Sequence, residues 1–187
     1  TVGTKIKFSD KRDSIWTTIA GKTTEQVLVF TNLGKSYSFQ LSEIPLEQEI
    51  YINQLLDFKN GEYITNILPY EKVKTYKYVI FATKNGTVKK TKIDEYLGNS
   101  KKTGLIALKM REGDSLVSIQ LIKDEDDKVF LATKKGNSLL LNQTDFSPIG
   151  RNTIGVKGIS LSENDELISM QVASNNTIEV LSITAQG

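Results

Sequence analysis

The sequence contains no cysteine and no histidine among its 187 residues. Without cysteine the chain has no disulfide, no zinc-finger site and no thiol nucleophile. Without histidine it lacks the most frequent general base, the usual transition-metal ligand and any Ser-His-Asp arrangement. A catalytic function would have to depend on Asp, Glu, Lys and Tyr, and we therefore expect no enzyme activity, no metal site and no cofactor in this chain.

Long apolar runs are also missing, since the longest extend over four or five residues. Such runs are too short to cross a bilayer, and no signal-like segment opens the chain, so we expect no membrane contact. The composition, with 39% hydrophobic and 25% charged residues, is typical of a globular protein.

Acidic residues are scarce in one stretch of the chain. Residues 76–111 carry nine basic and two acidic residues, a net charge of +7, whereas residues 1–75 are neutral and residues 112–187 carry −5. This segregation is hidden in the overall net charge of +2. It concentrates positive potential in a short stretch, which favours a polyanionic partner.

A motif of four or five β-branched or aromatic residues followed by Thr-x-x-Gly recurs along the chain. Its copies end at Gly34, Gly86 and Gly136, and a related segment ends at Gly187, with spacings of 52, 50 and 51 residues. Two other markers keep the same period: an acidic turn at 60–62, 112–114 and 163–165, and a glycine-led apolar segment at 104–108 and 155–159. Three markers at one spacing indicate a tandem repeat.

Each repeat has the pattern of β structure. The apolar run before Thr-x-x-Gly predicts a strand that enters a tight turn, and the residues that follow alternate between apolar and polar. About four short strands fit into each repeat, and the one weak helical candidate, residues 44–58, also fits loop plus strand. Four-stranded repeats of this length are typical of propeller blades, so we expect an all-β, propeller-like fold of ~51-residue four-stranded repeats. Tandem hairpins in a sandwich or barrel are the alternative.

We expect the whole chain, residues 1–187, to form a single domain built from the repeats. We expect a partial unit at 1–22, repeats at about 23–74, 75–124 and 125–174, and a partial unit at 175–187. Residues 1–6 resemble the middle of a repeat, and Gly187 falls at the turn of a new one. Either the two partial units join to close a small ring, or the chain is a piece of a longer subunit. We expect the second.

Four stretches of these repeats resemble the C-terminal domain of the A subunit of bacterial type IIA DNA topoisomerases, that is, topoisomerase IV or DNA gyrase. The resemblance covers nearly the whole chain from about Ser14, and the order and spacing of the stretches make it specific. The matching stretches are residues 28–35, 81–91, 103–108 and 150–159.

The resemblance implies a β-pinwheel, a ring of five or six blades with strands exchanged between neighbours. It also implies a basic rim that binds duplex DNA and bends it, presenting a segment for ATP-dependent strand passage by the full enzyme. The partners would be duplex DNA, the ATPase B subunit of the enzyme and the N-terminal part of the same A subunit, in the bacterial cytoplasm at the nucleoid. The catalytic tyrosine of the family lies in a separate region, so the seven tyrosines here are not read as catalytic.

One family feature is missing. DNA gyrase carries a basic box of the form Gln-Arg-Arg-Gly-Gly-Lys-Gly that enables strong chiral wrapping, and no stretch of this sequence matches it. The box normally precedes the first repeats of the family, so a sequence that starts after it would also lack it. Residues 16–35 resemble topoisomerase IV A subunits of Gram-positive type, and with the missing box this slightly favours topoisomerase IV over gyrase.

Basic residues near the turns of each repeat are the candidate phosphate contacts. A protein that bends DNA without reading sequence needs a track of lysine and arginine side chains along the duplex. The alternative for any single lysine is a solvated surface position that protects a strand edge. The candidate residues are Lys35, Lys84, Lys89, Lys90, Lys92, Lys101, Lys102, Lys134, Lys135, Arg151 and Lys157.

Other features of the sequence favour less specific roles. The acidic run 124–127 lacks the glycine and terminal glutamate of a calcium-binding loop, and we interpret it as a solvated turn. Trp16 is expected in the core rather than as a stacking platform for nucleotides. Two other functions stay open: a propeller-like protein-interaction scaffold that does not bind DNA, and an enzyme that uses Asp and Glu on a propeller face.

Overall fold

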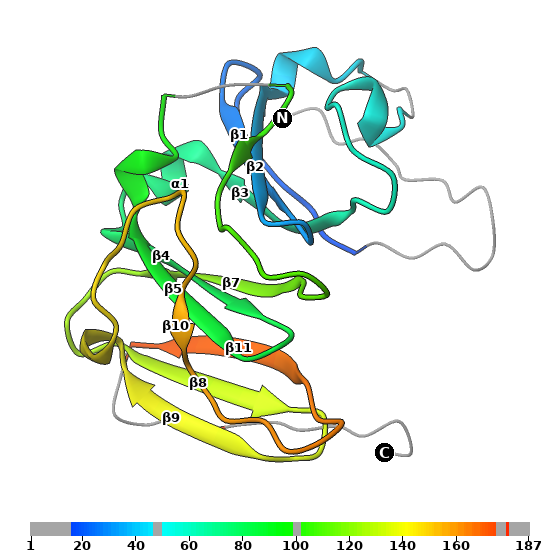
Figure 1. The fold of residues 1–187 in the computed structure, drawn as a ribbon. Coiled ribbons are helices and arrows are strands. Elements are labelled where there is room, and N and C mark those ends of the chain that lie inside the picture. The colour runs from blue at the N-terminus through cyan, green and yellow to red at the C-terminus, as the bar shows by residue number, and fades with distance from the viewer. Residues whose placement is uncertain (1–15, 47–49, 99–101, 175–178, 180–187) are drawn as a thin grey trace.

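The computed structural model describes residues 16–46, 50–98, 102–174 and 179 of the chain. They form three antiparallel sheets arranged in succession as blades (Figure 1). Blade A has the strand order β3 (Ile64–Pro69), β1 (Gln26–Thr31), β2 (Lys35–Gln40) and β6 (Leu105–Ile106). Blade B has the order β10 (Val156–Lys157), β5 (Thr87–Lys92), β4 (Tyr78–Thr83) and β7 (Leu116–Ile122). Blade C has the order β11 (Leu167–Ala173), β8 (Lys128–Thr133) and β9 (Ser138–Asn142).

Helical structure in the described residues is limited to short segments between strands. The described residues of the helical candidate 44–58 contain one 3₁₀ turn and otherwise loop, and residues 47–49 lie outside the described residues. No helix in the described part of the chain is long and apolar enough to span a membrane. The segments are η1 (Leu41–Glu43), η2 (Ile52–Gln54), α1 (Tyr70–Val73), η3 (Ile93–Glu95) and η4 (Gln143–Asp145).

The Thr-x-x-Gly motif forms the tight turn of one hairpin in each blade. In blades A and B the glycine N–H donates to the threonine carbonyl at 2.9 Å, from Gly34 to Thr31 and from Gly86 to Thr83. Both glycines have positive φ, 68° and 79°, a conformation that residues with a Cβ rarely adopt. The predicted hairpins β1–β2, β4–β5 and β8–β9 are therefore confirmed.

Each of the first two blades receives its last strand from the following repeat. β6 pairs with β2 of blade A, and β10 pairs with β5 of blade B. The glycines that precede these strands allow the close approach: a Cβ on Gly104 would lie 2.6 Å from the Tyr37 ring, and one on Gly155 would lie 2.3 Å from the Val88 carbonyl oxygen. The expected all-β, propeller-like architecture with exchanged strands is thus confirmed, and blade C has three strands among the described residues.

Two hydrophobic clusters lie between successive blades. Between blades A and B, Phe30 meets Phe81 and Tyr96 edge to face, with ring centroids 5.5 Å apart in both pairs. Between blades B and C, Ile80 and Leu131 are among the fully buried side chains. Burying a side chain of this size contributes about 2–3 kcal/mol, so the joints between blades hold much of the folding energy.

The first repeat differs from the others in its middle segment. Residues 50–58 fold back on their own blade, where Leu56 is buried against Val29 and Phe39. Trp16 is 62% exposed, so the expectation that it belongs to the core is wrong. The acidic run 124–127 is a turn with three exposed residues, as expected, but Asp127 is buried and accepts hydrogen bonds from two main-chain N–H groups. The repeat boundaries stay predictions, and most of both partial units lies outside the described residues.

Candidate nucleic-acid interface

Lys89, one of the candidate phosphate contacts, lies inside the protein. Its side chain is 1% exposed, and its Nζ donates to the main-chain carbonyls of Ala107 (2.8 Å), Thr153 (3.4 Å) and Arg151. Burial lowers the pKa of the Lys89 ammonium to about 8. The expectation that Lys89 faces solvent is wrong, because both faces of β5 are covered by neighbouring blades. An ammonium group enclosed by carbonyls is not available to a DNA phosphate.

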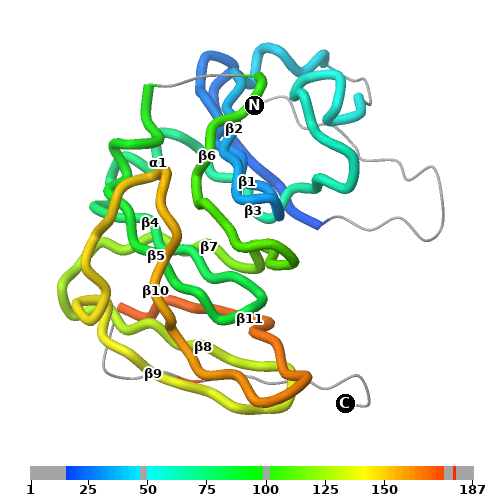
Figure 2. Tube along the Cα trace, in the orientation of Figure 1, coloured from blue at the N-terminus to red at the C-terminus, as the bar shows by residue number. Residues whose placement is uncertain are grey.

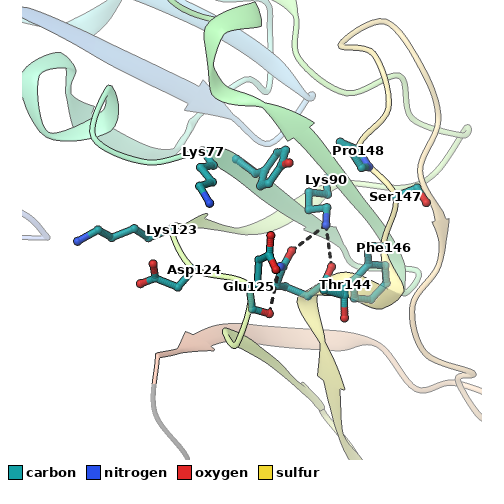
Figure 3. A pocket seen from close by; sticks show the side chains of 11 residues that line it. Lys77, Lys90, Lys123, Asp124, Glu125, Thr144, Phe146, Ser147 and Pro148 are labelled. Carbon is teal, nitrogen blue, oxygen red and sulfur yellow. Dashed lines mark hydrogen bonds between the residues drawn. The ribbon is translucent and has the colours of Figure 1, made fainter.

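Lys90 is also buried, with 5% of its surface exposed. Its Nζ donates to the main-chain carbonyl of Gln143 at 2.8 Å and to the side-chain Oε1 of the same residue at 2.7 Å. The Tyr78 ring lies 4.9 Å from Nζ, and burial lowers the pKa of the ammonium group. Figure 3 shows Lys90 at a cavity of about 300 Å³ that Lys77, Lys123, Asp124 and Glu125 also line, so the cavity has charges of both signs. We therefore remove Lys90 from the candidate phosphate contacts as well.

Three further candidates form ion pairs with carboxylates. Lys84 and Lys134, from the turns of blades B and C, both contact Glu166, at 2.8 and 3.1 Å, and Lys102 contacts Glu43 at 2.8 Å. The two ammonium groups hold the pKa of Glu166 below its usual range. Exposed pairs of this kind contribute little to stability, typically about 0–1 kcal/mol, so a phosphate can compete for these lysines.

Three candidates donate hydrogen bonds to neutral groups. Lys35 donates to the Tyr37 hydroxyl at 3.3 Å, and Lys135 donates to a main-chain carbonyl. Arg151 donates from Nη1 to the carbonyl of Ile106 at 2.8 Å, which joins the third repeat to the exchanged strand of blade A. None of these three side chains forms an ion pair with a described carboxylate, although the main-chain N–H of Arg151 donates to Glu95 Oε2 at 2.6 Å.

Two candidates are exposed with no such contact, and one lies outside the described residues. Lys92 at the end of β5 and Lys157 in β10 make no ion pair or side-chain hydrogen bond with the rest of the described chain. Lys101 lies outside the described residues. The set of candidates missed Lys109 and Arg111, which are exposed after β6. Both were counted in the basic stretch 76–111 but were not among the candidate phosphate contacts.

Five basic residues, four of them exposed and Arg151 half-buried, lie on the segments that contain the exchanged strands. We call residues 102–111 and 151–157 the exchanged-strand edge. These two segments hold five basic and no acidic residues, and they are joined by the hydrogen bond from the Lys109 N–H to the Thr153 carbonyl at 3.1 Å. In Figure 2 the exchanged strands β6 and β10 lie one below the other along the blades. The five basic residues are Lys102, Lys109, Arg111, Arg151 and Lys157.

Exposed apolar side chains lie on the same edge. Ile106 is 45% exposed, Val156 is 51% exposed and Ile154 is also exposed. The edge therefore combines positive charge with apolar surface, and within its own two segments there is no carboxylate that would repel an anion.

Comparison with known families places the repeats in context. The family described as "DNA gyrase C-terminal domain, beta-propeller" matches residues 25–46, 77–123 and 127–174, which is more than half of the chain. These matched segments contain the hairpins of the three blades and the two exchanged strands, β6 and β10.

Several curated proteins are similar over most of the chain. The DNA gyrase A protein of Mycolicibacterium smegmatis is 33% identical over 161 residues, and that of Chlamydia muridarum is 31% identical over 163 residues. These alignments cover 83% and 84% of this chain but 19% of each relative, so the chain spans about a fifth of their length.

Solved structures show the same fold. A crystal structure of the C-terminal domain of DNA topoisomerase IV is 27% identical, with a TM-score of 0.74, and the match covers 82% of this chain and 48% of that one. A DNA gyrase A C-terminal domain is 25% identical, with a TM-score of 0.64, and the match covers 81% of this chain and 49% of that one.

Proposed function

The chain belongs to the DNA gyrase C-terminal domain family of type IIA topoisomerase A subunits, and from this premise we propose that it binds and bends duplex DNA. It does so without catalysing a reaction itself. Its role in the full enzyme is to present a DNA segment for ATP-dependent strand passage by the ATPase B subunit together with the N-terminal part of the A subunit. That activity belongs to the whole enzyme subunit. This chain spans about a fifth of the length of the relatives that it matches.

The exchanged-strand edge is the observation that carries the proposal. Five basic and no acidic residues occupy two segments that are hydrogen-bonded to each other across the joint of blades A and B. Contacts between such residues and phosphates release condensed counterions and require no particular base sequence. Bending a short duplex costs on the order of 1–6 kcal/mol, which several phosphate contacts along one edge can offset.

The proposal makes a quantitative statement about salt. If five side chains contact phosphates, the logarithm of the binding constant falls with the logarithm of the salt concentration with a slope of about −4.5. Replacing both Lys109 and Lys157 with glutamate should weaken binding to all sequences alike and reduce the magnitude of the slope by at least about 2. The matched control is Lys72→Glu, a charge reversal of an exposed lysine in α1, far in sequence from this edge.

Binding to a fluorescent duplex at several salt concentrations measures these effects. A slope near zero for the wild-type chain, or equal losses from the edge variant and from the Lys72→Glu control, would contradict the assignment. Ligation of nicked circular DNA in the presence of the chain tests the choice between the two enzymes. On the resemblance of residues 16–35 we propose the topoisomerase IV type, for which only a small shift in linking number is expected.

A protein-interaction scaffold is the second candidate function. The exposed Ile106, Ile154 and Val156 on the exchanged-strand edge favour it, because exposed apolar surface is typical of protein interfaces. Under this alternative the chain does not shift duplex DNA in a gel.

A further inference from the structure

Two consecutive lysines of β5 extend to opposite faces of blade B. Because side chains alternate along a strand, Lys89 faces the joint with blade A and Lys90 faces the joint with blade C. Both side chains are buried, and neither ammonium group has a carboxylate within ion-pair distance among the described residues. All their hydrogen-bond acceptors are neutral oxygens.

Lys89 connects three segments at the joint of blades A and B. One acceptor, the carbonyl of Ala107, follows β6, and the Ala107 N–H donates to the carbonyl of Gly34 in the turn of blade A. The other two acceptors, the carbonyls of Arg151 and Thr153, lie directly before β10 of blade B. One ammonium group thus holds together the ends of both exchanged strands.

Lys90 makes the corresponding connection at the joint of blades B and C. Both of its acceptors belong to Gln143, the first residue of η4, which follows the last strand of the blade C hairpin. The Gln143 side chain in turn donates to the carbonyl of Glu125 at the other end of that hairpin (Figure 3). The main-chain carbonyl of Lys90 also accepts a hydrogen bond from the N–H of Ile149. Lys90 in β5 is therefore both a donor and an acceptor toward the segment 143–149 that follows β9.

Stability alone does not explain two buried cations that have no ion-pair partner, although the more distant Glu95 carboxylate favours the charged form of Lys89. Burying an ammonium group is unfavourable, and apolar residues of similar size usually replace buried charges without loss of stability.

The equivalent register of the other two hairpins holds no lysine. Lys89 corresponds to Tyr37, which is buried with its hydroxyl bonded to Glu62, and to Leu139, which is 37% exposed. Lys90 corresponds to Ser38 and Leu140. The charges are present only in the blade that has a described neighbour on each side.

We propose that Lys89 and Lys90 are positioning residues that fix the angles at which blade B meets blades A and C. The directional hydrogen bonds of each ammonium group allow one arrangement of the joint, whereas an apolar side chain would allow several. This inference rests on the proposed function in one respect: the two angles set the curvature of the exchanged-strand edge, and hence the bend of the DNA that follows it. Neither lysine contacts DNA.

Spin labels on blades A and C test the angles directly. Because the chain has no cysteine, Thr24→Cys and Ser138→Cys introduce two labels at exposed positions without further changes. Electron–electron distance measurements should give one narrow distribution for the otherwise wild-type chain. Lys89→Met and Lys90→Met should each broaden or shift it, while Lys92→Met, which removes an exposed charge of the same strand, should leave it unchanged.

DNA measurements separate positioning from contact. Lys89→Met and Lys90→Met should keep the salt slope of short-duplex binding, whereas Lys92→Met should reduce its magnitude by about 1 if Lys92 touches a phosphate. On a longer duplex labelled at both ends, energy transfer at saturating protein should fall for the two buried-lysine variants, because the bend is smaller or less uniform. This split between affinity and bend is not expected from a general loss of stability.

The outcomes are distinguishable. An unchanged distance distribution in Lys89→Met and Lys90→Met overturns the inference, as does a salt slope that falls in either of them. If the wild-type chain binds no duplex, the proposed function fails, while the distance measurement still decides the role of the lysines. If a lysine variant does not fold, Gln143→Leu removes an acceptor of Lys90 without altering β5, and an unchanged distribution in that variant overturns the inference for the joint of blades B and C.

Discussion

The energetic effect of burying the Lys89 ammonium is measurable as a pH dependence of stability. The pKa of this group is about 8 in the folded protein, against 10.5 for a solvated lysine. Between these two pH values the unfolded chain holds a proton that the folded chain has lost. Stability therefore rises with pH in this window, and it is lowest below pH 8, where the buried group is charged.

The size of the effect follows from the two pKa values. At pH 7 the difference of about 2.5 pKa units corresponds to about 3 kcal/mol of lost stability, and at pH 9.5 about 1 kcal/mol of that loss remains. The contribution of Lys89 should therefore raise the free energy of unfolding by about 2 kcal/mol between pH 7 and 9.5. The Lys89→Met variant lacks this contribution. The free energy of unfolding of the variant minus that of the wild-type chain should therefore fall by about 2 kcal/mol between pH 7 and 9.5.

Urea unfolding of both proteins at several pH values provides the test. The difference between them isolates Lys89, because Lys90, whose pKa is also lowered by burial, is present in both. The range ends at pH 9.5 because burial raises the pKa values of Tyr37 and Tyr96, which lowers stability once the unfolded tyrosines ionise near pH 10. Parallel pH profiles for the two proteins, with a constant offset, would refute the assignment of a buried charged lysine.

Two further substitutions test the exchanged strands and the joint between blades. Gly155→Ala would place a Cβ 2.3 Å from the Val88 carbonyl oxygen and should cost at least about 1–3 kcal/mol by thermal unfolding, whereas Gly150→Ala, in open space, should stay within about 0.5 kcal/mol; equal effects would contradict the close approach. Phe81→Ala should cost about 3–5 kcal/mol in urea unfolding, because Phe81 is fully buried against Phe30 between blades A and B, and a loss below about 1 kcal/mol would show that this joint is not tightly packed.

The architecture was accessible from the sequence because its determinants are local and repeated. Thr-x-x-Gly specifies the hairpin turn through the positive φ of Gly34 and Gly86. The period carries over to the segments led by Gly104 and Gly155, whose lack of a side chain permits close packing on Tyr37 and Val88. Because each of these features occurs in more than one repeat at the same spacing, the fold prediction does not depend on a single motif.

The candidate site was harder to predict, because the exposure of a lysine depends on contacts between distant repeats. Alternation of side chains along a strand explains why Lys89 and Lys90 lie on opposite faces of β5. It did not indicate that blades A and C cover both faces, since the carbonyls that bind Lys89 are 18, 62 and 64 residues away in sequence. The ion pair of Lys84 with Glu166 spans 82 residues and gives no local signal either.

The exchange of strands also has a consequence for synthesis on the ribosome. β2 of blade A obtains its outer neighbour only from β6, and Lys35 pairs with Ile106, which is translated 71 residues later. At about 5–20 residues per second, the nascent blade waits on the order of 4–14 seconds for this strand. During that interval the unpaired edge of β2 can pair with a strand of another chain. Each blade that waits for an exchanged strand therefore passes through a stage of synthesis at which it can assemble with the wrong partner.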